Sequence, residues 1–283
     1  MRVSLPPQLV ERAREFAEGR RTPTEPRDAA TVVLMRAGSN GLELYLLRRH
    51  TTMAFAGGMC VFPGGGVDHR DFDHLVAWAG PEPAAWAEQL RTSAEMARAL
   101  VCAAVRETFE ESGVLLAGPS ASEVVADLTG DDWERDRRAL EAKELPFTSF
   151  LDRRGLVLRS DLLGTWAAWC TPEFEPKRFR TWFFVATLPQ GQRTRDVSSE
   201  SSSVTWMSPL GACDAADAHE LVMMPPTYVT CLEVGQHTHP EAVLSAASGR
   251  DMAMFTPTVE GNGEDATMSV PERVLPLLEA RSG

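Results

Sequence analysis

The sequence predicts a mixed α/β fold, and three features of it carry that prediction. Two strand-like apolar runs, residues 29–35 and 42–48, are separated by a Gly-Ser-Asn-Gly turn and predict a hairpin. A helical stretch rich in Ala, Leu, Val and Met follows at residues 94–112. Further strand-like runs come after it, at residues 162–170 and 178–188. Strands on both sides of a long helix are typical of a sheet that packs against helices.

The other elements are assigned from shorter apolar patterns. An amphipathic helix at residues 8–19 precedes the hairpin, and a short strand at residues 59–62 follows it. The later pattern predicts a short strand at residues 204–207, and helices at residues 120–141, 148–153, 209–218, 226–235 and 270–280.

Length and composition are those of a globular chain of 283 residues. The hydrophobic content of 43% and the charged content of 24% are typical of soluble domains. The formal net charge of −12 argues against a nucleic-acid-binding surface, which needs clustered Lys and Arg. We expect a single domain over residues 1–283, with a core at about residues 29–232 and a C-terminal extension at about residues 236–283.

Cysteine usage and the lack of targeting segments bear on the compartment. The five cysteines form no CxxC pair and are odd in number, so we expect reduced thiols. The sequence shows no signal peptide and no apolar run of transmembrane length. These features predict a cytoplasmic protein that binds neither a membrane nor a nucleic acid.

The helical stretch ends in a cluster of acidic residues. Glu107, Glu110 and Glu111 are spaced i, i+3 and i+4, so their carboxylates project from one face of a helix. Like charges at this spacing destabilise a helix by about 0.2–0.5 kcal/mol per pair, and the nearest cation is Arg106. Three hard oxygen donors on a rigid helix suit Mg²⁺ or Mn²⁺. The alternative is a solvated acidic face without function.

A glycine-rich loop ahead of the helix favours the functional interpretation. Residues 62–66 read Phe-Pro-Gly-Gly-Gly, a sequence that forces a tight turn where backbone groups can approach a ligand closely. This loop, followed by Arg-Glu-Thr-Phe-Glu-Glu-Ser-Gly-Val at residues 106–114, resembles the Nudix hydrolase family. The family box reads GX5EX7REUXEEXGU, where U is a bulky aliphatic residue, and Gly65 matches its first glycine.

Three departures from the box stand out. The spacing from Gly65 to Arg106 is far longer than in the usual box, so residues at about 68–93 are interpreted as an insertion. Two residues are candidates for the isolated middle glutamate: Asp71 lies at the expected offset, and Glu95 lies nearer the helix. Thr108 replaces the usual aliphatic residue. An insertion at this place resembles a Nudix branch that includes peroxisomal CoA diphosphatases.

The insertion itself has a weak pattern. The acidic run at residues 68–73 is interpreted as a solvated loop, with a metal site as the less favoured alternative. The following residues, up to 89, predict a loop and one short helix that lies over the mouth of the site. Trp78 and Trp86 within it are expected to pack on the domain.

The resemblance implies a fold and a set of roles. The fold is a Nudix-like α/β/α sandwich with a mixed β-sheet, with extra helices inserted in and after the box. Diphosphate hydrolysis in this family needs Mg²⁺ or Mn²⁺, and Arg106 would orient a glutamate by a salt bridge. An acid from a later loop often acts as ligand or base, and Glu200 is the candidate; a solvent-facing loop glutamate is the alternative. The metal ligands implied are the carbonyl of Gly64 and the carboxylates of Glu107, Glu110 and Glu111, with Glu107 as a further ligand or base.

A second resemblance concerns the substrate. CoA-directed Nudix enzymes carry a pattern close to LLTxR[SA]x3Rx3Gx3FPGG before the box. Arg49 and Gly58 match it and are predicted to bind the substrate, while His50 and Ala54 replace its small residue and second arginine. For Arg48 and Arg49 the alternative is a pair of surface charges at the end of a strand. CoA or an acyl-CoA is therefore the leading substrate.

Other functions remain open from the sequence alone. The runner-up is a Nudix pyrophosphatase for another nucleotide, such as a dinucleotide, a nucleoside diphosphate sugar or a nucleoside triphosphate. A third hypothesis is a Nudix-type regulator that binds a ligand without turnover. Retention of the four charged residues at positions 106, 107, 110 and 111 argues against the regulator. A homodimer is a family expectation.

Overall fold

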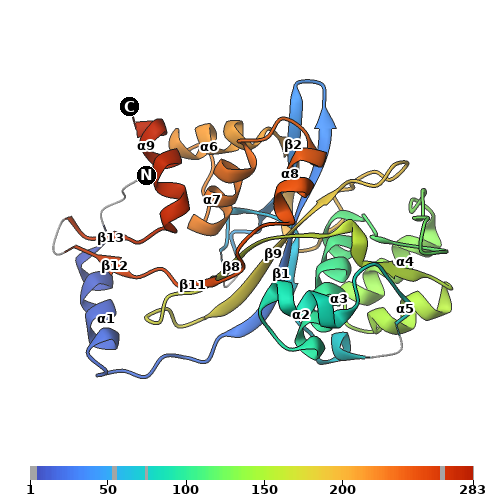
Figure 1. Cartoon of the computed structure of the whole chain (residues 1–283), viewed down its shortest axis with the longest axis horizontal. Coiled ribbons are helices and arrows are strands. Elements are labelled where there is room, and N and C mark those ends of the chain that lie inside the picture. The colour runs from blue at the N-terminus through green and yellow to red at the C-terminus, as the bar shows by residue number, and fades with distance from the viewer. Residues whose placement is uncertain (1–4, 53–55, 74–75, 262–264, 283) are drawn as a thin grey trace.

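The computed structural model describes residues 5–52, 56–73, 76–261 and 265–282. Within these residues, the main sheet has eight strands in the order β10-β2-β1-β9-β8-β11, with β3 beside β2 and β4 beside β1 (Figure 1). Its strands are β1 Arg27–Gly38, β2 Gly41–Arg49, β3 Cys60–Val61, β4 Gly64–Gly66, β8 Gly164–Cys170, β9 Phe179–Thr187, β10 Ser201–Met207 and β11 Met254–Phe255.

The sheet is mixed. Strand β1 pairs antiparallel with β2, with Met35 opposite Leu44, and parallel with β9. β8 pairs antiparallel with β9 and parallel with β11. Because β1 lies between β2 and β9, the hairpin predicted at the start of the chain becomes the centre of the sheet.

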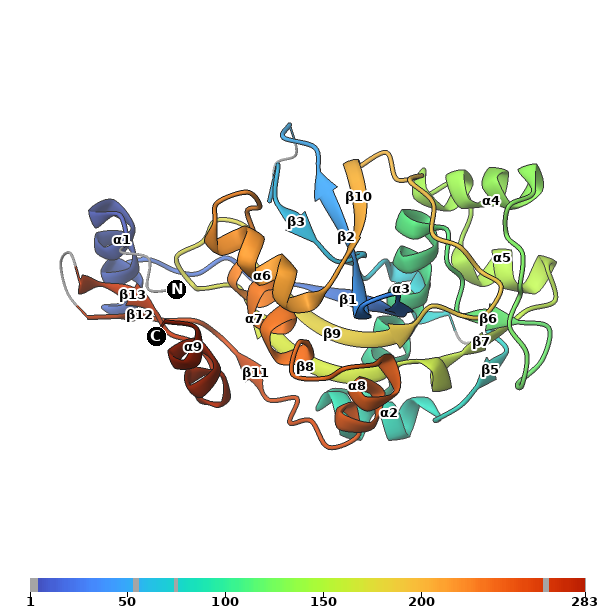
Figure 2. The same ribbon diagram turned by 90° about the horizontal axis from the view of Figure 1, so that it is seen from above.

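Helices cover both faces of this sheet (Figures 1 and 2). One layer holds α2, α3, α4 and α5, and the other holds α6, α7, α8 and α9. The helices are α1 Pro7–Ala17, α2 Pro83–Leu90, α3 Ala94–Ser112, α4 Asp131–Glu141, α5 Phe147–Arg153, α6 Pro209–Asp217, α7 Pro225–Val234, α8 Pro240–Ala247 and α9 Leu275–Ser282.

Strand β1 shows why the sheet is buried on both sides. Val32 and Leu34 belong to the core under α3, whereas Val33 and Met35 belong to the core under α7 and α8. Successive side chains on a strand point to opposite faces, so a continuous apolar run fits a strand between two helical layers. The α/β/α sandwich expected from the sequence is therefore confirmed.

Two smaller sheets lie outside the main one. β5 Trp78–Ala79 and β6 Ala117–Gly118 flank β7 Val157–Arg159, and β12 Val259–Glu260 pairs with β13 Thr267–Met268. Three short 3-10 turns are also described, η1 His69–Phe72, η2 Ser160–Leu162 and η4 Glu272–Val274. No described helix has the length and apolar character needed to cross a membrane.

Most predicted elements are confirmed, and two are wrong in part. The helix at residues 94–112 has the predicted ends, and the described cysteines are buried and free. The helix predicted at residues 120–141 begins only at Asp131, after the N-cap Gly130.

The helix of the insertion, α2, packs against α3, and Trp86 contacts Phe184 of β9 at a centroid distance of 5.9 Å. It therefore joins the core, and the prediction that it covers the site is not supported by these contacts.

The C-terminal residues also belong to the sandwich. β11 extends the main sheet beside β8, and α8 packs on β8 and β9. Glu233 of α7 is buried and pairs with Arg250 and Arg273, both at 2.8 Å. The boundary of a single domain at residues 1–283 stays a prediction, but these contacts support it.

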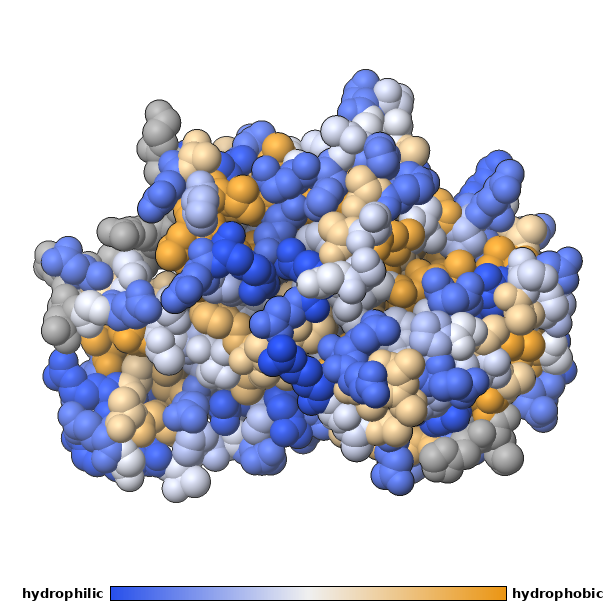
Figure 3. Space-filling view, in the orientation of Figure 1, coloured by the Kyte–Doolittle hydropathy of each residue, from blue (hydrophilic) through white to orange (hydrophobic). Residues whose placement is uncertain are grey.

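Hydrophilic residues cover most of the face seen in Figure 3, with apolar residues between them. Among the described residues, the large hydrophobic side chains that are exposed are Leu210, Val222 and Leu275. They are single residues on different elements, which is normal for a folded surface.

The replacement at Thr108 has a local explanation and gives a prediction. Its side chain is fully buried, and Oγ1 donates to the Ala104 carbonyl at 2.7 Å. Thr108→Val removes the hydroxyl but leaves no buried group unpaired, because that carbonyl keeps its helical hydrogen bond. We expect the free energy of unfolding, measured by urea denaturation, to change by less than about 1 kcal/mol.

Thr108→Ser is the matched control, because it keeps the hydroxyl and deletes the methyl group. We expect this variant to lose about 1 kcal/mol. A loss above about 3 kcal/mol for Thr108→Val would contradict the explanation.

Candidate active site

Helix α3 brings the acidic cluster to a buried helix end. It begins at Ser93, whose side chain accepts a hydrogen bond from the Met96 amide, and ends at Gly113 with φ 73°. The last turn of a helix carries partial negative charge, so carboxylates there are disfavoured. The three glutamates of this end therefore need positive partners from other parts of the chain.

Arg106 is the first such partner. Its side chain is only 9% exposed, and Nη1 donates to Glu107 Oε1 at 2.7 Å and to Glu110 Oε1 at 3.3 Å. Nε and Nη2 donate to the two carboxylate oxygens of Asp71 at 3.1 and 3.0 Å, and Nη2 also donates to the Gly66 carbonyl. Burial alone would lower the pKa of Arg106, but Glu107, Asp71 and Glu110 outweigh it and raise the pKa. Arg106 thus stays charged and joins three carboxylates.

Asp71 is the acidic residue that the sequence left undecided. It is 1% exposed, and besides Arg106 it accepts a hydrogen bond from the Asp68 amide in a capping box at η1. Glu95 lies in the first turn of α3 and is exposed. The structure therefore brings Asp71 and not Glu95 to Arg106. The interpretation of the acidic run as a solvated loop is wrong for Asp71, because this side chain is buried and forms an ion pair with Arg106.

The glycine loop forms strand β4 and holds the glutamates from the other side. The Gly64 amide donates to Glu111 Oε2 at 2.8 Å, and Gly64 pairs with Thr31 of β1. A Cβ atom on Gly65 would collide with the carboxylate of Glu107. A larger residue here would therefore displace the Glu107 carboxylate from its position beside Arg106. The loop and the acidic helix, distant in sequence, therefore meet in one site.

The environment changes the protonation of these glutamates. Burial is the main cause that raises the pKa of Glu107, Glu110 and Glu111, and for Glu110 the pKa reaches about 8. For Glu110 and Glu111 the charge of Glu107 adds to the rise, whereas Arg106 lowers the pKa of Glu110. Each of these carboxyls would be ionised more readily beside a cation, and the donors are hard oxygens, so the residues fit a divalent cation such as Mg²⁺ or Mn²⁺.

The described acidic side chains are not arranged as a set of metal ligands. Over the described part of the chain, no group of three or more His, Cys, Asp and Glu side chains is arranged to hold an ion. Contacts explain this, because Glu107 and Glu110 face Arg106 while Glu111 accepts from Gly64. The metal ligands named from the sequence, including the Gly64 carbonyl, stay predictions.

Glu200 and Arg49 lie beside this cluster. Arg49 Nη2 donates to Glu200 Oε2 at 2.9 Å, and the Glu200 carbonyl accepts from the His50 amide. The Glu200 carboxylate is 49% exposed, and its charge raises the pKa of Glu107 and Glu111. Arg49 has the opposite effect on Glu111. The late acid and the first arginine of the CoA pattern are thus within electrostatic range of the acidic helix.

The other residues of the CoA pattern have local roles. Gly58 has φ 76°, and its amide donates to the Arg49 carbonyl at 3.1 Å, so it closes the turn after β2. Its carbonyl accepts a longer hydrogen bond from Arg48 Nε at 3.4 Å. Ala54 lies outside the described residues. These contacts assign Gly58 to the backbone turn, and its binding of substrate stays a prediction.

Arg137 is a site residue that the sequence interpretation missed. It is 2% exposed, and Nη1 donates to the Glu110 carbonyl at 2.6 Å. Glu134 and Glu141, one turn away on either side in α4, pair with it at 2.9 and 3.0 Å. The spacing i−3 and i+4 was visible in the sequence. Charged residues on a helix usually face solvent, so nothing indicated that this arginine is buried.

Arg195 is a second arginine that contacts the C-terminal end of α3. Its amide donates to the Ser112 carbonyl at 2.9 Å, and Nη1 pairs with Glu134 at 3.0 Å. Its guanidinium lies against Gly113, where a Cβ atom would be 2.9 Å from Nε. Two arginines from distant segments therefore contact the negative end of α3.

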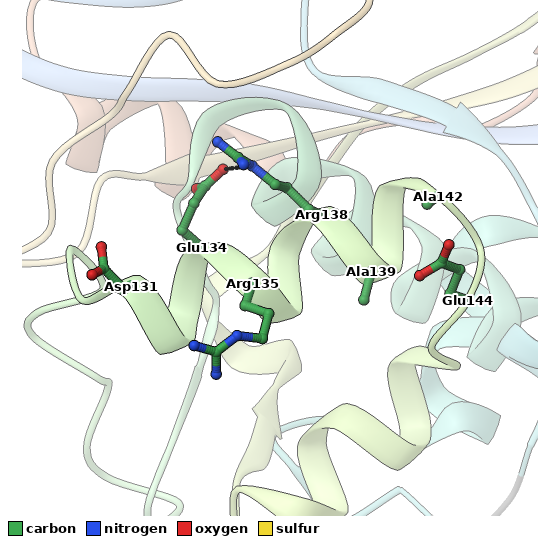
Figure 4. A pocket seen from close by; sticks show the side chains of 7 residues that line it. All are labelled: Asp131, Glu134, Arg135, Arg138, Ala139, Ala142 and Glu144. Atoms are coloured by element: carbon green, nitrogen blue, oxygen red, sulfur yellow. Dashed lines mark hydrogen bonds and ion pairs between the residues drawn. The ribbon is translucent and has the colours of Figure 1, made fainter.

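A surface hollow on α4 is separate from the acidic cluster. Figure 4 shows side chains of this hollow, with Arg138 turned toward Glu134 and paired with it at 2.8 Å. The residues that line it are Asp131, Glu134, Arg135, Arg138, Ala139, Ala142 and Glu144. None of the residues predicted to be catalytic lines this hollow, so we do not assign substrate binding to it.

The fold and this site define a Nudix hydrolase, and comparison with known proteins shows the family. The family model of the NUDT19 Nudix domain matches residues 85–233, and the chain belongs to this family of Nudix hydrolases. It is similar to a putative nudix hydrolase 7 of Caenorhabditis elegans, with 28% identity over 205 residues, which cover 71% of this chain and 57% of that protein. The resemblance drawn from the box and the glycine loop is thus confirmed.

Two further proteins are similar to this chain. The acyl-coenzyme A diphosphatase NUDT19 of Xenopus laevis is 26% identical over 220 residues, which cover 66% of this chain and 58% of that protein. The chain therefore spans under two thirds of the length of these curated relatives. A solved Nudix hydrolase from Alicyclobacillus acidocaldarius is 25% identical, with a TM-score of 0.67, and covers 78% of this chain and 96% of its own.

The contacts of Glu134 give a prediction of pH dependence. Burial raises the pKa of Glu134, but Arg137, Arg138 and Arg195 outweigh it and lower the pKa from 4.5 to about 2. The unfolded chain therefore binds more protons between these values, and stability falls as the pH drops from 4.5 toward 2. We expect Glu134→Gln to lose about 1–3 kcal/mol at pH 6, and this loss to shrink steadily near pH 3.

Urea denaturation at the two pH values measures this difference. Glu144→Gln, at an exposed position of the same segment, is the matched control and should change stability little at either pH. A loss for Glu134→Gln that is equal at both pH values would contradict the assignment.

Proposed function

We propose that this chain is a metal-dependent pyrophosphohydrolase that cleaves the diphosphate bond of a nucleoside diphosphate linked to another group. CoA or an acyl-CoA is the proposed substrate. The observation that carries the proposal is the buried cluster of Glu107, Glu110 and Glu111, which Arg106 and the glycine loop hold together. Mg²⁺ or Mn²⁺ is the proposed cofactor. A cytoplasmic location and a homodimer, the latter from the family expectation alone, belong to the same proposal.

The reaction adds water to one phosphorus and breaks its bond to the bridging oxygen. The water oxygen becomes part of one phosphate product, its proton passes to a carboxylate, and the bridging oxygen leaves with the other phosphate. A divalent ion held by the glutamates and the Gly64 carbonyl would neutralise the phosphoryl oxygens and lower the pKa of a bound water. For CoA the products are 4′-phosphopantetheine and 3′,5′-ADP.

The residues around the ligand set have distinct proposed roles. Arg106 orients Glu107 and Glu110, and Asp71 in turn orients Arg106, because all four groups are joined by short ion pairs. Glu200, half exposed and next to the cluster, is the proposed acceptor of the proton of the attacking water. Arg49 supplies a positive charge on the same side for a phosphate of the substrate.

Two observations support the CoA assignment over other diphosphates. Similar proteins from Xenopus laevis and Gallus gallus carry the name acyl-coenzyme A diphosphatase NUDT19, and the chicken protein is 26% identical over 253 residues. Arg49, which matches the CoA pattern, faces the acidic cluster closely enough to lower the pKa of Glu111. Its Nε is buried without a hydrogen-bond partner among the described residues, so a donor is available for an anionic ligand.

The first prediction from this proposal concerns Glu110. With Mg²⁺ or Mn²⁺, the protein is expected to convert CoA or acetyl-CoA faster than NADH, ADP-ribose, diadenosine polyphosphates or nucleoside triphosphates. Glu110→Gln keeps the shape and removes the charge, so we expect kcat to fall by about 10²–10⁴-fold. Chromatography of the products measures both effects.

Glu144→Gln is the control for this experiment and should retain full activity. Preference for a different diphosphate would keep the site and remove the CoA assignment. If no diphosphate were cleaved while the ligand affinity of Glu110→Gln equalled that of the wild type, the non-catalytic regulator would replace the enzyme.

The second prediction separates the two arginines of β2. Neighbouring residues of a strand point to opposite sides, and Arg48 is exposed whereas Arg49 faces the cluster. Arg49→Ala removes a charged hydrogen-bond donor, so kcat/KM for CoA should fall by about 10–100-fold. Arg48→Ala should change it less than about threefold. Equal losses for the two variants in steady-state kinetics would argue against a substrate contact of Arg49.

A further inference from the structure

A single segment, residues 192–200, crosses the C-terminal end of α3 and carries Glu200. At its start, the side chain of Gln192 accepts from the Leu115 amide and donates to the Leu115 carbonyl, both at 2.9 Å. The Arg195 carbonyl accepts from the buried Tyr45 hydroxyl at 3.0 Å. The first half of the segment is therefore held firmly against α3 and β2.

The second half of the segment is held by α4. Glu141 Oε1 accepts hydrogen bonds from the Ser199 amide at 2.7 Å and the Ser199 hydroxyl at 2.8 Å. Glu141 is the last residue of α4, and Ser199 directly precedes Glu200. The backbone of the proposed late acid is thus held on one side by a carboxylate from a different helix and on the other by the His50 amide, which donates to the Glu200 carbonyl at 3.0 Å.

The same carboxylate is joined to the acidic helix by Arg137. Glu141 Oε2 accepts from Arg137 Nη1 at 3.0 Å, and this nitrogen also donates to the Glu110 carbonyl at 2.6 Å. Arg137 is almost fully buried, and Glu134 fixes its Nε and Nη2. The guanidinium therefore has one orientation, and a continuous chain of contacts runs from Glu110 through Arg137 and Glu141 to Ser199.

The carboxylate of Glu200 itself has little else to fix it. It is half exposed, and its described partner is Arg49, which the proposed function also assigns to the substrate. A side chain on an exposed loop loses precision unless surrounding contacts fix its backbone. The two hydrogen bonds from Ser199 to Glu141 supply this constraint immediately before Glu200.

We propose that Arg137 and Glu141 are positioning residues that set the distance of Glu200 from the glutamates of α3. This inference rests on the proposed function, because it assigns them an effect on turnover through Glu200. Arg137 contacts the helix that carries the ligand set, and Glu141 contacts the loop that carries the base. One ion pair within α4 therefore connects the two halves of the site.

A double-mutant cycle tests the inference. In the wild-type background, Glu141→Ala should lower kcat for CoA by about 10–100-fold, with KM changed less than twofold. In the Glu200→Gln background, the same substitution should change kcat less than about twofold, because the group that it positions is already inactive. Glu141→Gln keeps an acceptor for Ser199 but loses the ion pair with Arg137, so its kcat should lie between those of the wild type and Glu141→Ala.

Each outcome has a defined meaning. If Glu141→Ala lowered kcat equally in both backgrounds, the effect would be structural and the inference would be wrong. If Glu110→Gln abolished turnover while Glu200→Gln did not lower it, the proposed function would stand and only this inference would fall. If the wild type cleaved no diphosphate, both would fall.

Thermal unfolding of each variant identifies general destabilisation. Glu141→Gln is the variant to rely on if Glu141→Ala does not fold, and Glu144→Ala, close by in the same segment and exposed, is the matched control. Glu144→Ala should leave kcat, KM and the unfolding midpoint unchanged.

Discussion

The ion pairs of Arg106 are the contacts on which the site depends. Four carboxylates come close together at the end of one helix, and three of them, Asp71, Glu107 and Glu110, contact this single guanidinium. Removing one partner of a buried charge pair leaves the others uncompensated, which costs about 3–5 kcal/mol in proteins. The positions of the glycine loop, the turn at Asp71 and the last turns of α3 are therefore not independent. All three segments lie within hydrogen-bonding distance of the Arg106 side chain.

The single positive charge of Arg106 does not balance four carboxylates. The other features of the site can be understood from this imbalance. The raised pKa values of Glu110 and Glu111 show that two of the carboxylates resist ionisation while they are buried. Arg137 and Arg195 act on the helix end instead, because they contact backbone carbonyls of its last turn or the glycine that closes it. The carboxyl groups of this face outnumber the guanidinium that contacts them, and a divalent cation bound there would favour their ionised form.

The sequence predicted those parts of the site that lie close together in the chain. The ends of α3 follow from its apolar pattern and from Gly113, and the hairpin follows from a turn between two apolar runs. The burial of Asp71 and Arg137 could not be predicted in this way, because it depends on partners far away in sequence. Spacing named Asp71 only as one of two candidates, beside Glu95, and could not show that it is buried. For Arg137, only the packing of α4 against α3 reveals that the arginine faces inward.

The inserted residues show how a motif can be divided in sequence and remain whole in space. The insertion lies between the glycine loop and α3, and near its beginning Asp71 returns to Arg106 through their ion pair. Between them, α2 is tied to the sheet, since Leu90 accepts from Trp182 Nε1 at 3.1 Å and Trp86 packs against Phe184. Closure entropy grows only slowly with loop length. A long insertion that buries its own helix is therefore compatible with the contacts of Arg106, to which it contributes Asp71.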